Sequence, residues 1–212
     1  MIAIDLDDTP LTDDITVTER TIRAIGAARR KGLEVVIATG RMFTTARPYG
    51  RLLNLGDIPM MLYSGALVQT VETGRILFHD PIPQAAAARL LAQARQNGWM
   101  MQTYIDDVLR VPRHNHWVAE YERITGTTAV IAGDEFYEPQ GAPSKVLAYG
   151  EKPELDRMAE LIEQDQPGVF ALMRSKDTFL EIIRHGIDKG TGLDHLCEYF
   201  NIRADNVMAI GN

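Results

Sequence analysis

The chain opens on Ile2-Ala3-Ile4-Asp5-Leu6-Asp7-Asp8-Thr9, an apolar segment that passes directly into a cluster of aspartates. Side chains on a strand alternate between its two sides, so Asp5 and Asp7 are expected to point the same way. Neighbouring carboxylates repel each other, and such a pair normally persists because a cation lies between them or because one carboxylate does chemistry. The alternative is an acidic turn or helix cap, the common role of aspartate clusters. These residues alone favour neither interpretation.

Composition limits the kind of protein. Of the 212 residues, 45% are hydrophobic and 24% are charged, which is typical of a globular chain and excludes a disordered one. The net charge of −7 argues against binding to nucleic acid or to an anionic membrane surface. No apolar run is long enough to span a bilayer, and no secretory signal precedes the first strand. Because the single Cys197 cannot form an intrachain disulfide, we expect a cytoplasmic protein; nothing indicates an oligomeric state.

Strands and helices alternate over the first part of the chain. The sequence predicts short apolar strands at 2–6, 33–38 and 60–63. Helices fill the intervals, and the first begins at Thr16-Val17-Thr18-Glu19, where Thr16 and Glu19 have the spacing of a capping box. This order predicts an α/β fold with a doubly wound parallel sheet and right-handed crossovers.

Polar residues follow each of these strands. Asp5 and Asp7 follow the first strand, Thr39 the second and Ser64 the third. In open parallel sheets, ligands bind outside the carboxyl ends of the strands. We therefore expect these residues to gather at one site, and this favours a functional role for the aspartates over an acidic turn.

The pattern changes after the third strand. Between 82 and 184 we expect β-hairpins at 100–111 and 169–183, combined with helices, which together form an α+β layer unlike the parallel core. The predicted domains are a core made of 1–81 and 185–212 and an inserted α+β domain at 82–184.

The chain returns to the core after the insert. Asp188-Lys189-Gly190 is expected to open a helix with Leu196 and Cys197 on its buried face, and 207–210 to form a fourth core strand. A parallel strand at this point should be followed by a loop and another covering helix. The sequence stops at Gly211-Asn212, so we expect a truncated C-terminus.

The order of these elements and four short motifs resemble the haloacid dehalogenase superfamily of phosphohydrolases, specifically its Cof-type branch, which has a large cap inserted after the third core strand. Residues 5–9 match the first motif, Thr39 within 37–41 the second and Lys189 the third, and 208–212 look like the start of the fourth. Each motif alone is weak, but their order and their places at strand ends make the combination specific. The resemblance covers essentially the whole chain.

Resemblance to this family implies a phosphatase of small phosphorylated metabolites, such as sugar phosphates or phosphorylated cofactors. Asp5 would be the nucleophile that forms an aspartyl phosphate, which water then hydrolyses. Asp7 would protonate the leaving alcohol and later activate that water. Three further groups would bind the phosphate: the Thr39 side chain, the Gly40 backbone N–H and the Lys189 ammonium.

The same resemblance implies a Mg²⁺ cofactor, because a carboxylate approaches a phosphate dianion only when charge is neutralised. Its ligands would be the Asp5 carboxylate, the backbone carbonyl of Asp7 and Asn212. Most relatives have aspartate in place of Asn212, and asparagine keeps an oxygen but loses the charge that Mg²⁺ favours. Pro10, where the family usually has an apolar residue, fixes φ just past the catalytic loop. Because Asn212 lacks that charge and the sequence ends before the downstream acidic residue of the fourth motif, the metal site of this chain is expected to be incomplete.

A second hypothesis follows from that incomplete metal site. Asp, Thr and Lys around a phosphorylatable carboxylate would also suit a non-catalytic phosphate-binding or phospho-accepting module of the same fold. The insert of about 100 residues argues against it, because it far exceeds an ordinary connection. Turnover would eliminate the module, whereas a stable phosphorylated Asp5 would favour it.

Other residues of the insert have ordinary explanations. His114 and His116 have no third metal ligand nearby in the sequence, so a metal role is not expected. Tyr104, Arg110 and Trp117 suit either a substrate-facing position or an ordinary place in the core or on the surface.

Overall fold

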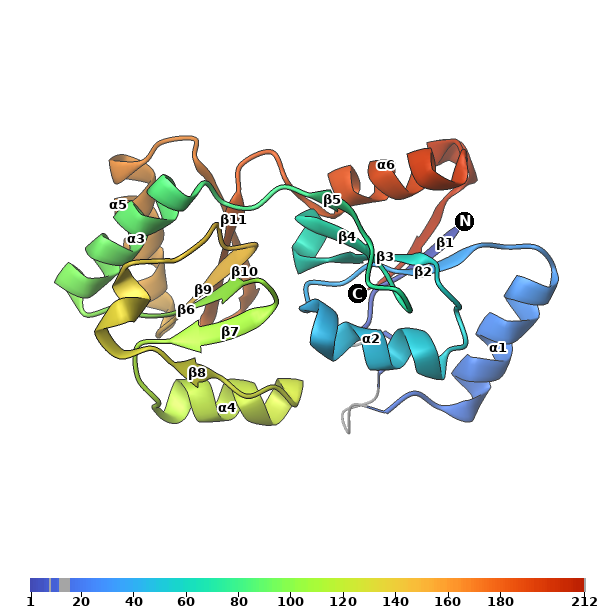
Figure 1. Cartoon of the computed structure of the whole chain (residues 1–212), viewed down its shortest axis with the longest axis horizontal. Coiled ribbons are helices and arrows are strands. Elements are labelled where there is room, and N and C mark those ends of the chain that lie inside the picture. The colour runs from blue at the N-terminus through green and yellow to red at the C-terminus, as the bar shows by residue number, and fades with distance from the viewer. Residues whose placement is uncertain (8, 12–15, 212) are drawn as a thin grey trace. The chain divides into compact units, whose positions relative to one another are not determined.

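The structure is a computed structural model that describes residues 1–7, 9–11 and 16–211 (Figure 1). It contains two compact units: a core unit, Met1–His79 with Ile187–Asn212, and an inserted unit, Asp80–Gly186. No helix in the described part of the chain has the length and hydropathy of a membrane span.

The core unit is built on short strands. They are β1 (Ile2–Ile4), β2 (Val35–Ile37), β3 (Pro59–Leu62), β4 (Leu67–Thr70), β5 (Ile76–His79) and β12 (Met208–Ile210). In the order β12-β1-β2 they form a parallel sheet, in which Ile2 lies opposite both Met208 and Val35. A parallel bridge between Ala38 and Met61 leads on to β3, which pairs with β4 in a second, antiparallel sheet that also includes β5.

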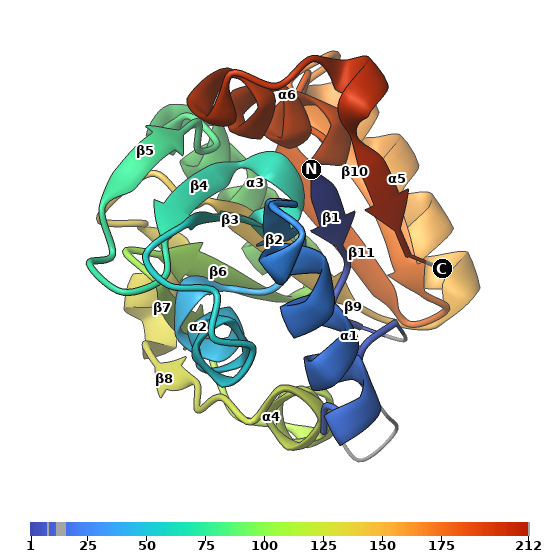
Figure 2. The same ribbon diagram turned by 90° about the vertical axis from the view of Figure 1, so that its right-hand side faces the viewer.

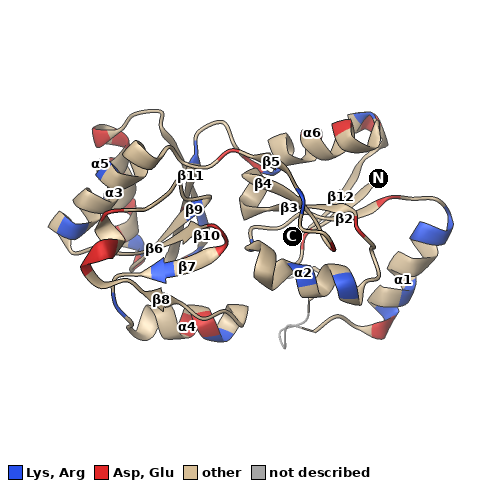
Figure 3. Ribbon diagram, in the orientation of Figure 1, with Lys and Arg blue, Asp and Glu red and all other residues tan. Residues whose placement is uncertain are grey.

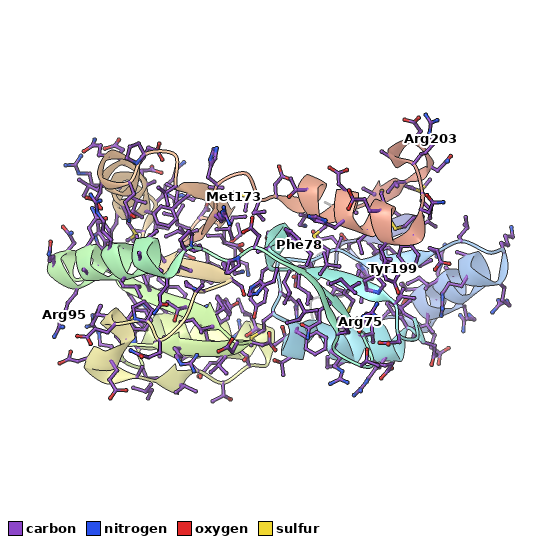
Figure 4. All side chains as sticks on the ribbon, turned by 45° about the horizontal axis from the view of Figure 1, so that its top comes forward. Arg75, Phe78, Arg95, Met173, Tyr199 and Arg203 are labelled. Carbon is purple, nitrogen blue, oxygen red and sulfur yellow. The ribbon has the colours of Figure 1, made fainter. Side chains whose placement is uncertain are left out.

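Helices cover both faces of the core sheet, with α6 on one face and α1 and α2 on the other (Figure 1, Figure 2). Their bounds are Glu19–Arg30 for α1, Phe43–Leu52 for α2 and Lys189–Phe200 for α6. Leu196 of α6 is buried in a cluster with Ala3 and Val36 of the sheet. Phe78 of β5, labelled in Figure 4, stacks on His195 of α6 with ring centroids 3.7 Å apart. The predicted doubly wound α/β fold is confirmed.

The start of α1 differs from the prediction. Thr18, not Thr16, is the N-cap, and its hydroxyl accepts a hydrogen bond from the Thr21 backbone N–H at 3.2 Å. The predicted capping box was wrong because Glu19 is the first residue of the helix, whereas the reciprocal bond needs a side chain at the third. Glu19 instead places a negative charge in the first turn, and arginines occupy the last turn, an arrangement that suits the helix dipole (Figure 3).

The inserted unit is an antiparallel-rich sheet with helices. In the sheet order β10-β11-β9-β6-β7-β8, the strands are Phe170–Lys176, Phe179–Arg184, Lys145–Tyr149, Met100–Ile105, Val108–Val111 and Val130–Ile131. The helices are α3 (Gln84–Asn97), α4 (His116–Thr125) and α5 (Lys152–Asp165). Short 3₁₀ turns in the two units are η1 (Tyr63–Gly65), η2 (Gly133–Tyr137) and η3 (Ala204–Asn206).

Both predicted hairpins are present in the inserted unit. β6 and β7 pair antiparallel across Asp106 and Asp107, whose positive φ angles of 53° and 58° are those of a tight hairpin turn. β10 and β11 form the second hairpin. Residues of α3 and α5 share one apolar core with Met101, Val146 and Ile182 of the sheet. This core is separate from the one beneath α6, as expected for an α+β unit with its own packing.

Candidate active site

The carboxyl end of β1 positions Asp5. Its backbone N–H donates to the carbonyl oxygen of Ile210 at 2.9 Å, which continues the pairing of β1 with β12 by one residue. Oδ1 of Asp5 accepts a hydrogen bond from the Leu6 N–H at 2.8 Å, and Oδ2 pairs with the ammonium of Lys189. Only 16% of the Asp5 side chain is exposed. The fold therefore brings the predicted nucleophile and the predicted phosphate-binding cation together.

Lys189 is the first residue of α6, and the helix start is firmly capped. Oδ1 of Asp188 accepts a hydrogen bond from the Thr191 N–H at 2.8 Å, and the Thr191 hydroxyl accepts one from the Asp188 N–H at 3.0 Å. A cation is unfavourable in the first turn, because the helix dipole is positive there. The ion pair with Asp5 offsets this unfavourable interaction. The N-terminus of α6 itself attracts anions, so the Lys189 ammonium lies near a position that favours an anion.

Asp7 has a different cation. The Asp7 carboxylate accepts hydrogen bonds from Nη2 of Arg41 at 2.6 Å and from its Nε at 3.0 and 3.1 Å. The Arg41 side chain is 9% exposed and the Asp7 side chain 51%. The strand predicted to reach Leu6 ends at Ile4, so strand alternation does not govern where the two aspartates point. Arg41 belongs to the second predicted motif, but no pattern in the sequence indicated its ion pair with Asp7.

The loop after β2 contains the predicted phosphate-binding residues Thr39 and Gly40. Thr39 is fully buried, its N–H donates to the Met61 carbonyl at 2.9 Å, and its hydroxyl accepts a hydrogen bond from the Arg41 N–H at 3.2 Å. A hydroxyl that accepts one bond keeps its own proton for donation. Thr39 therefore retains a donor of the kind that a phosphate oxygen requires.

A strained turn, η1, braces this loop. The Tyr63 N–H donates to the Arg41 carbonyl and the Ser64 N–H to the Thr39 carbonyl, each at 3.1 Å. Tyr63 and Ser64 have φ angles of 50° and 57°, a left-handed conformation that costs about 1–3 kcal/mol for each non-glycine residue. Gly65 follows with φ of 110°, and a Cβ there would overlap the carbonyl oxygen of Asp188. The turn thus links the Thr39 loop to the start of α6.

A family model of the haloacid dehalogenase-like hydrolases matches residues 2–212. The chain belongs to this family. Over 219 residues this hydrolase is 25% identical to the 5-amino-6-(5-phospho-D-ribitylamino)uracil phosphatase YitU of Bacillus subtilis, in a match covering 100% of this chain and 79% of YitU. It is also 25% identical over 222 residues to the pyridoxal phosphate phosphatase YbhA of Escherichia coli, with 100% and 80% covered. The solved structure of TM0651 from Thermotoga maritima matches with a TM-score of 0.86 and 27% identity, over 98% of this chain and 78% of that one.

The oxygen donors of this hydrolase fit a divalent cation. Asp5 offers carboxylate oxygens and Asp7 a backbone carbonyl, which are the hard donors that Mg²⁺ prefers. Mg²⁺ commonly takes one or two carboxylates and completes its shell with water and substrate phosphate, so it needs no cage of three acidic or imidazole side chains. The described residues hold no such cluster of three. Asn212, the third predicted ligand, lies outside the described residues.

The candidate residues of the inserted unit have partners within that unit. Nε2 of His114 pairs with Oε2 of Glu122 at 3.1 Å, and Arg110 donates to a backbone carbonyl at 3.0 Å. The Tyr104 hydroxyl is buried and donates to that of Tyr121, and burial raises the pKa of Tyr104 well above its ordinary value. Each of these three side chains is therefore hydrogen-bonded within the inserted unit.

Proposed function

We propose that this hydrolase removes phosphate from small phosphorylated metabolites through an aspartyl phosphate on Asp5. One observation carries the proposal: a nearly buried carboxylate at the end of a parallel strand pairs with a lysine ammonium from another element. A charge pair in that position suits nucleophilic attack on a phosphate, because the ammonium lowers the repulsion between carboxylate and dianion. Relatives named as phosphatases support the same reaction class.

The reaction has two steps. In the first, an oxygen of Asp5 bonds to phosphorus, the bond from phosphorus to the alcohol oxygen breaks, and Asp7 gives its proton to that oxygen. In the second, Asp7 takes a proton from water, whose oxygen attacks phosphorus and releases inorganic phosphate from Asp5. Asp5 and Asp7 both return to their starting states, so the net reaction is hydrolysis.

Three donors near Asp5 would hold the phosphate. The Thr39 hydroxyl, the Gly40 N–H and the Lys189 ammonium would contact its oxygens. Lys189 would serve twice, since its ammonium holds the Asp5 carboxylate and can share its charge with the phosphate. Backbone bonds between the Thr39 loop and η1 hold the Thr39 loop, and the cap of α6 holds the backbone at Lys189, so binding would require little reorganisation.

Mg²⁺ would be held by the Asp5 carboxylate, the Asp7 backbone carbonyl and Asn212. When bound, it supplies positive charge that offsets the repulsion between the Asp5 carboxylate and the phosphate. Loss of turnover in chelator, restored by added Mg²⁺, is the result expected from this assignment.

The inserted unit is proposed to be the cap that selects the substrate and excludes water. YitU and YbhA are named for a phosphorylated ribitylamino-uracil and for pyridoxal phosphate. Phosphorylated cofactors and their precursors are therefore the first substrates to test, followed by sugar phosphates.

The proposal is tested by Mg²⁺-dependent hydrolysis of p-nitrophenyl phosphate. We expect turnover in the native chain and none in Asp5→Asn, which keeps the shape but not the nucleophile. Asp205→Asn is a matched control, because Asp205 is an exposed acid of the same unit that pairs with Arg203. A folded native chain that becomes phosphorylated on Asp5 without multiple turnovers would establish the phospho-accepting module instead.

A further inference from the structure

We infer that Arg41 is the residue that positions Asp7 for proton transfer, an inference that rests on the proposed function. Its guanidinium binds the carboxylate through two nitrogens, Nε and Nη2. Fork-like binding of this kind fixes both the position and the plane of a carboxylate, which a single point charge does not. Asp7 lies beyond the end of β1, so no strand pairing fixes its side chain.

The two partners differ in exposure, and this indicates which one is the anchor. The Arg41 side chain is 9% exposed, whereas that of Asp7 is 51% exposed. A guanidinium so deeply buried is costly to move, because its charge would have to be satisfied elsewhere. The orientation of the pair is therefore set from the Arg41 side, and the carboxylate extends from it toward solvent.

Arg41 is itself fixed by neighbouring elements. Its N–H donates to the Thr39 hydroxyl at 3.2 Å, and its carbonyl accepts the Tyr63 N–H at 3.1 Å. On α2, the ring of Tyr49 lies with its centroid 5.5 Å from the guanidinium carbon, within the range of a cation–π contact. Arg41 is thus held by contacts from the loop after β2, from the turn η1 and from α2, and its guanidinium binds the Asp7 carboxylate.

The contacts also distinguish the two carboxylate oxygens of Asp7. Oδ1 accepts from Nη2 at 2.6 Å and from Nε at 3.0 Å, whereas Oδ2 accepts only the longer Nε contact at 3.1 Å within the described residues. A carboxylate oxygen has a limited number of lone-pair sites. Oδ2 retains more of its capacity, so it is the oxygen through which we expect Asp7 to exchange a proton with the substrate.

A positioning role has a signature that a purely structural role lacks. Proton donation matters most for poor leaving groups, and a nitrophenolate departs with little help. The measurement is kcat/KM for a series of aryl phosphates of similar size, from p-nitrophenyl phosphate to phenyl phosphate. For Arg41→Met we expect a loss of about 100-fold with phenyl phosphate and of less than about 10-fold with p-nitrophenyl phosphate.

Two comparisons make the test specific. Arg41→Lys keeps the charge without the fork and should lie between the native chain and Arg41→Met, which also covers the case in which the methionine variant folds poorly. In an Asp7→Asn background, Arg41→Met should add less than about 2-fold, because both changes remove the same proton transfer. Arg51→Met is the matched control. Arg51 lies on α2 in an exposed pair with Glu72, and its loss should leave the ratio of kcat/KM between phenyl phosphate and p-nitrophenyl phosphate unchanged.

The inference is overturned if Arg41→Met lowers kcat/KM equally across the series, or if its effect multiplies fully with that of Asp7→Asn. Either result would make Arg41 a structural residue of the loop. This outcome is distinct from failure of the proposed function, in which the native chain itself shows no hydrolysis that depends on Asp5.

Discussion

The core unit and the inserted unit both contain a lysine–carboxylate pair, but the two pairs differ in how far the lysine is exposed to solvent. Lys189 and Asp5 come from the start of a helix and the end of a strand, and the lysine side chain is 45% exposed. Lys145 and Glu181 lie 3.4 Å apart on β9 and β11, with side chains 4% and 13% exposed. The first pair is open to a ligand, whereas the second belongs to the interior of a sheet.

This difference in exposure distinguishes charged pairs suited to chemistry from charged pairs that stabilise the fold. Around Lys145, the Tyr104 ring lies 5.1 Å from the ammonium, and Tyr104 continues through its hydroxyl to Tyr121. In a buried network, each member depends on the others for its hydrogen bonds. At a strand end, backbone groups make the hydrogen bonds that hold the fold, so the side chains remain available to bind ligands. Mutations in the two pairs should therefore affect different properties.

The largest effect is expected in the core pair. Lys189→Met removes the ammonium that pairs with Asp5 and is proposed to bind phosphate, and we expect kcat to fall by about 10²–10³-fold, the usual effect of losing one electrostatic contact in an active site. The lysine side chain is 45% exposed and unfavourably placed at a helix start, so water can replace its ammonium beside Asp5, and the melting temperature should fall less than in Lys145→Met. Steady-state kinetics and thermal melts measure both quantities. A large drop in melting temperature with activity retained would reverse the assignment.

The second effect belongs to the inserted pair and concerns stability. Lys145→Met leaves Glu181 buried without its cation, so we expect the free energy of unfolding to fall by about 3 kcal/mol. Urea unfolding followed by circular dichroism measures this loss. Arg157→Met, in an exposed pair with Glu160, is the control and should unfold like the native chain. Equal stabilities for the two variants would show that the Lys145 pair is not structural.

The smallest effect distinguishes Asp57 from Asp5 and Asp7, the proposed catalytic aspartates of the same unit. Its carboxylate accepts hydrogen bonds from the N–H groups of Glu72 and Thr73 and from the Thr73 hydroxyl, each at 2.8 Å. These bonds, those from Thr73 first, lower the pKa of Asp57 from 3.8 to about 2. A pKa lowered by folding adds stability that is present above the unfolded value and is lost as pH falls through the folded value.

We therefore expect the native chain to melt at a higher temperature than Asp57→Asn at about pH 5, and the difference to shrink between about pH 4 and pH 2. Thermal melts across this range measure it. A difference that stays constant with pH would show that the Asp57 hydrogen bonds do not favour its ionised form.

The elements predicted from sequence are those with a local signal. Apolar runs gave the parallel strands, Asp106-Asp107 between two such runs gave a hairpin, and the residues after Asp188 gave α6. β4 and β5 have no predicted counterpart: β4, although mostly buried, is only four residues long and ends in the polar residues Gln69 and Thr70, and β5 lies at the sheet edge and has no buried residue. Short, half-exposed strands at a sheet edge lack the continuous apolar pattern of buried ones.

The site was predictable in part for the same reason. Asp5, Asp7, Thr39 and Lys189 follow strands or open a helix, so topology predicts that they lie at one edge of the sheet, and the structure pairs Asp5 with Lys189. The pair of Arg41 with Asp7 depends on where two loops meet, and no local pattern encodes it. The left-handed Tyr63 and Ser64 were also hidden, since glycine and asparagine are the usual signals for positive φ.

The central claim is that Asp5 carries the phosphoryl group, and acid-quench trapping tests it most directly. The native chain, Asp5→Asn and Asp7→Asn would each be mixed with radiolabelled p-nitrophenyl phosphate and Mg²⁺, quenched in acid and mapped by peptide mass spectrometry. We predict label on the peptide that contains Asp5 in the native chain, none in Asp5→Asn, and more in Asp7→Asn, because the second step needs the Asp7 base. Turnover without label at Asp5, or label on another residue, would contradict the account.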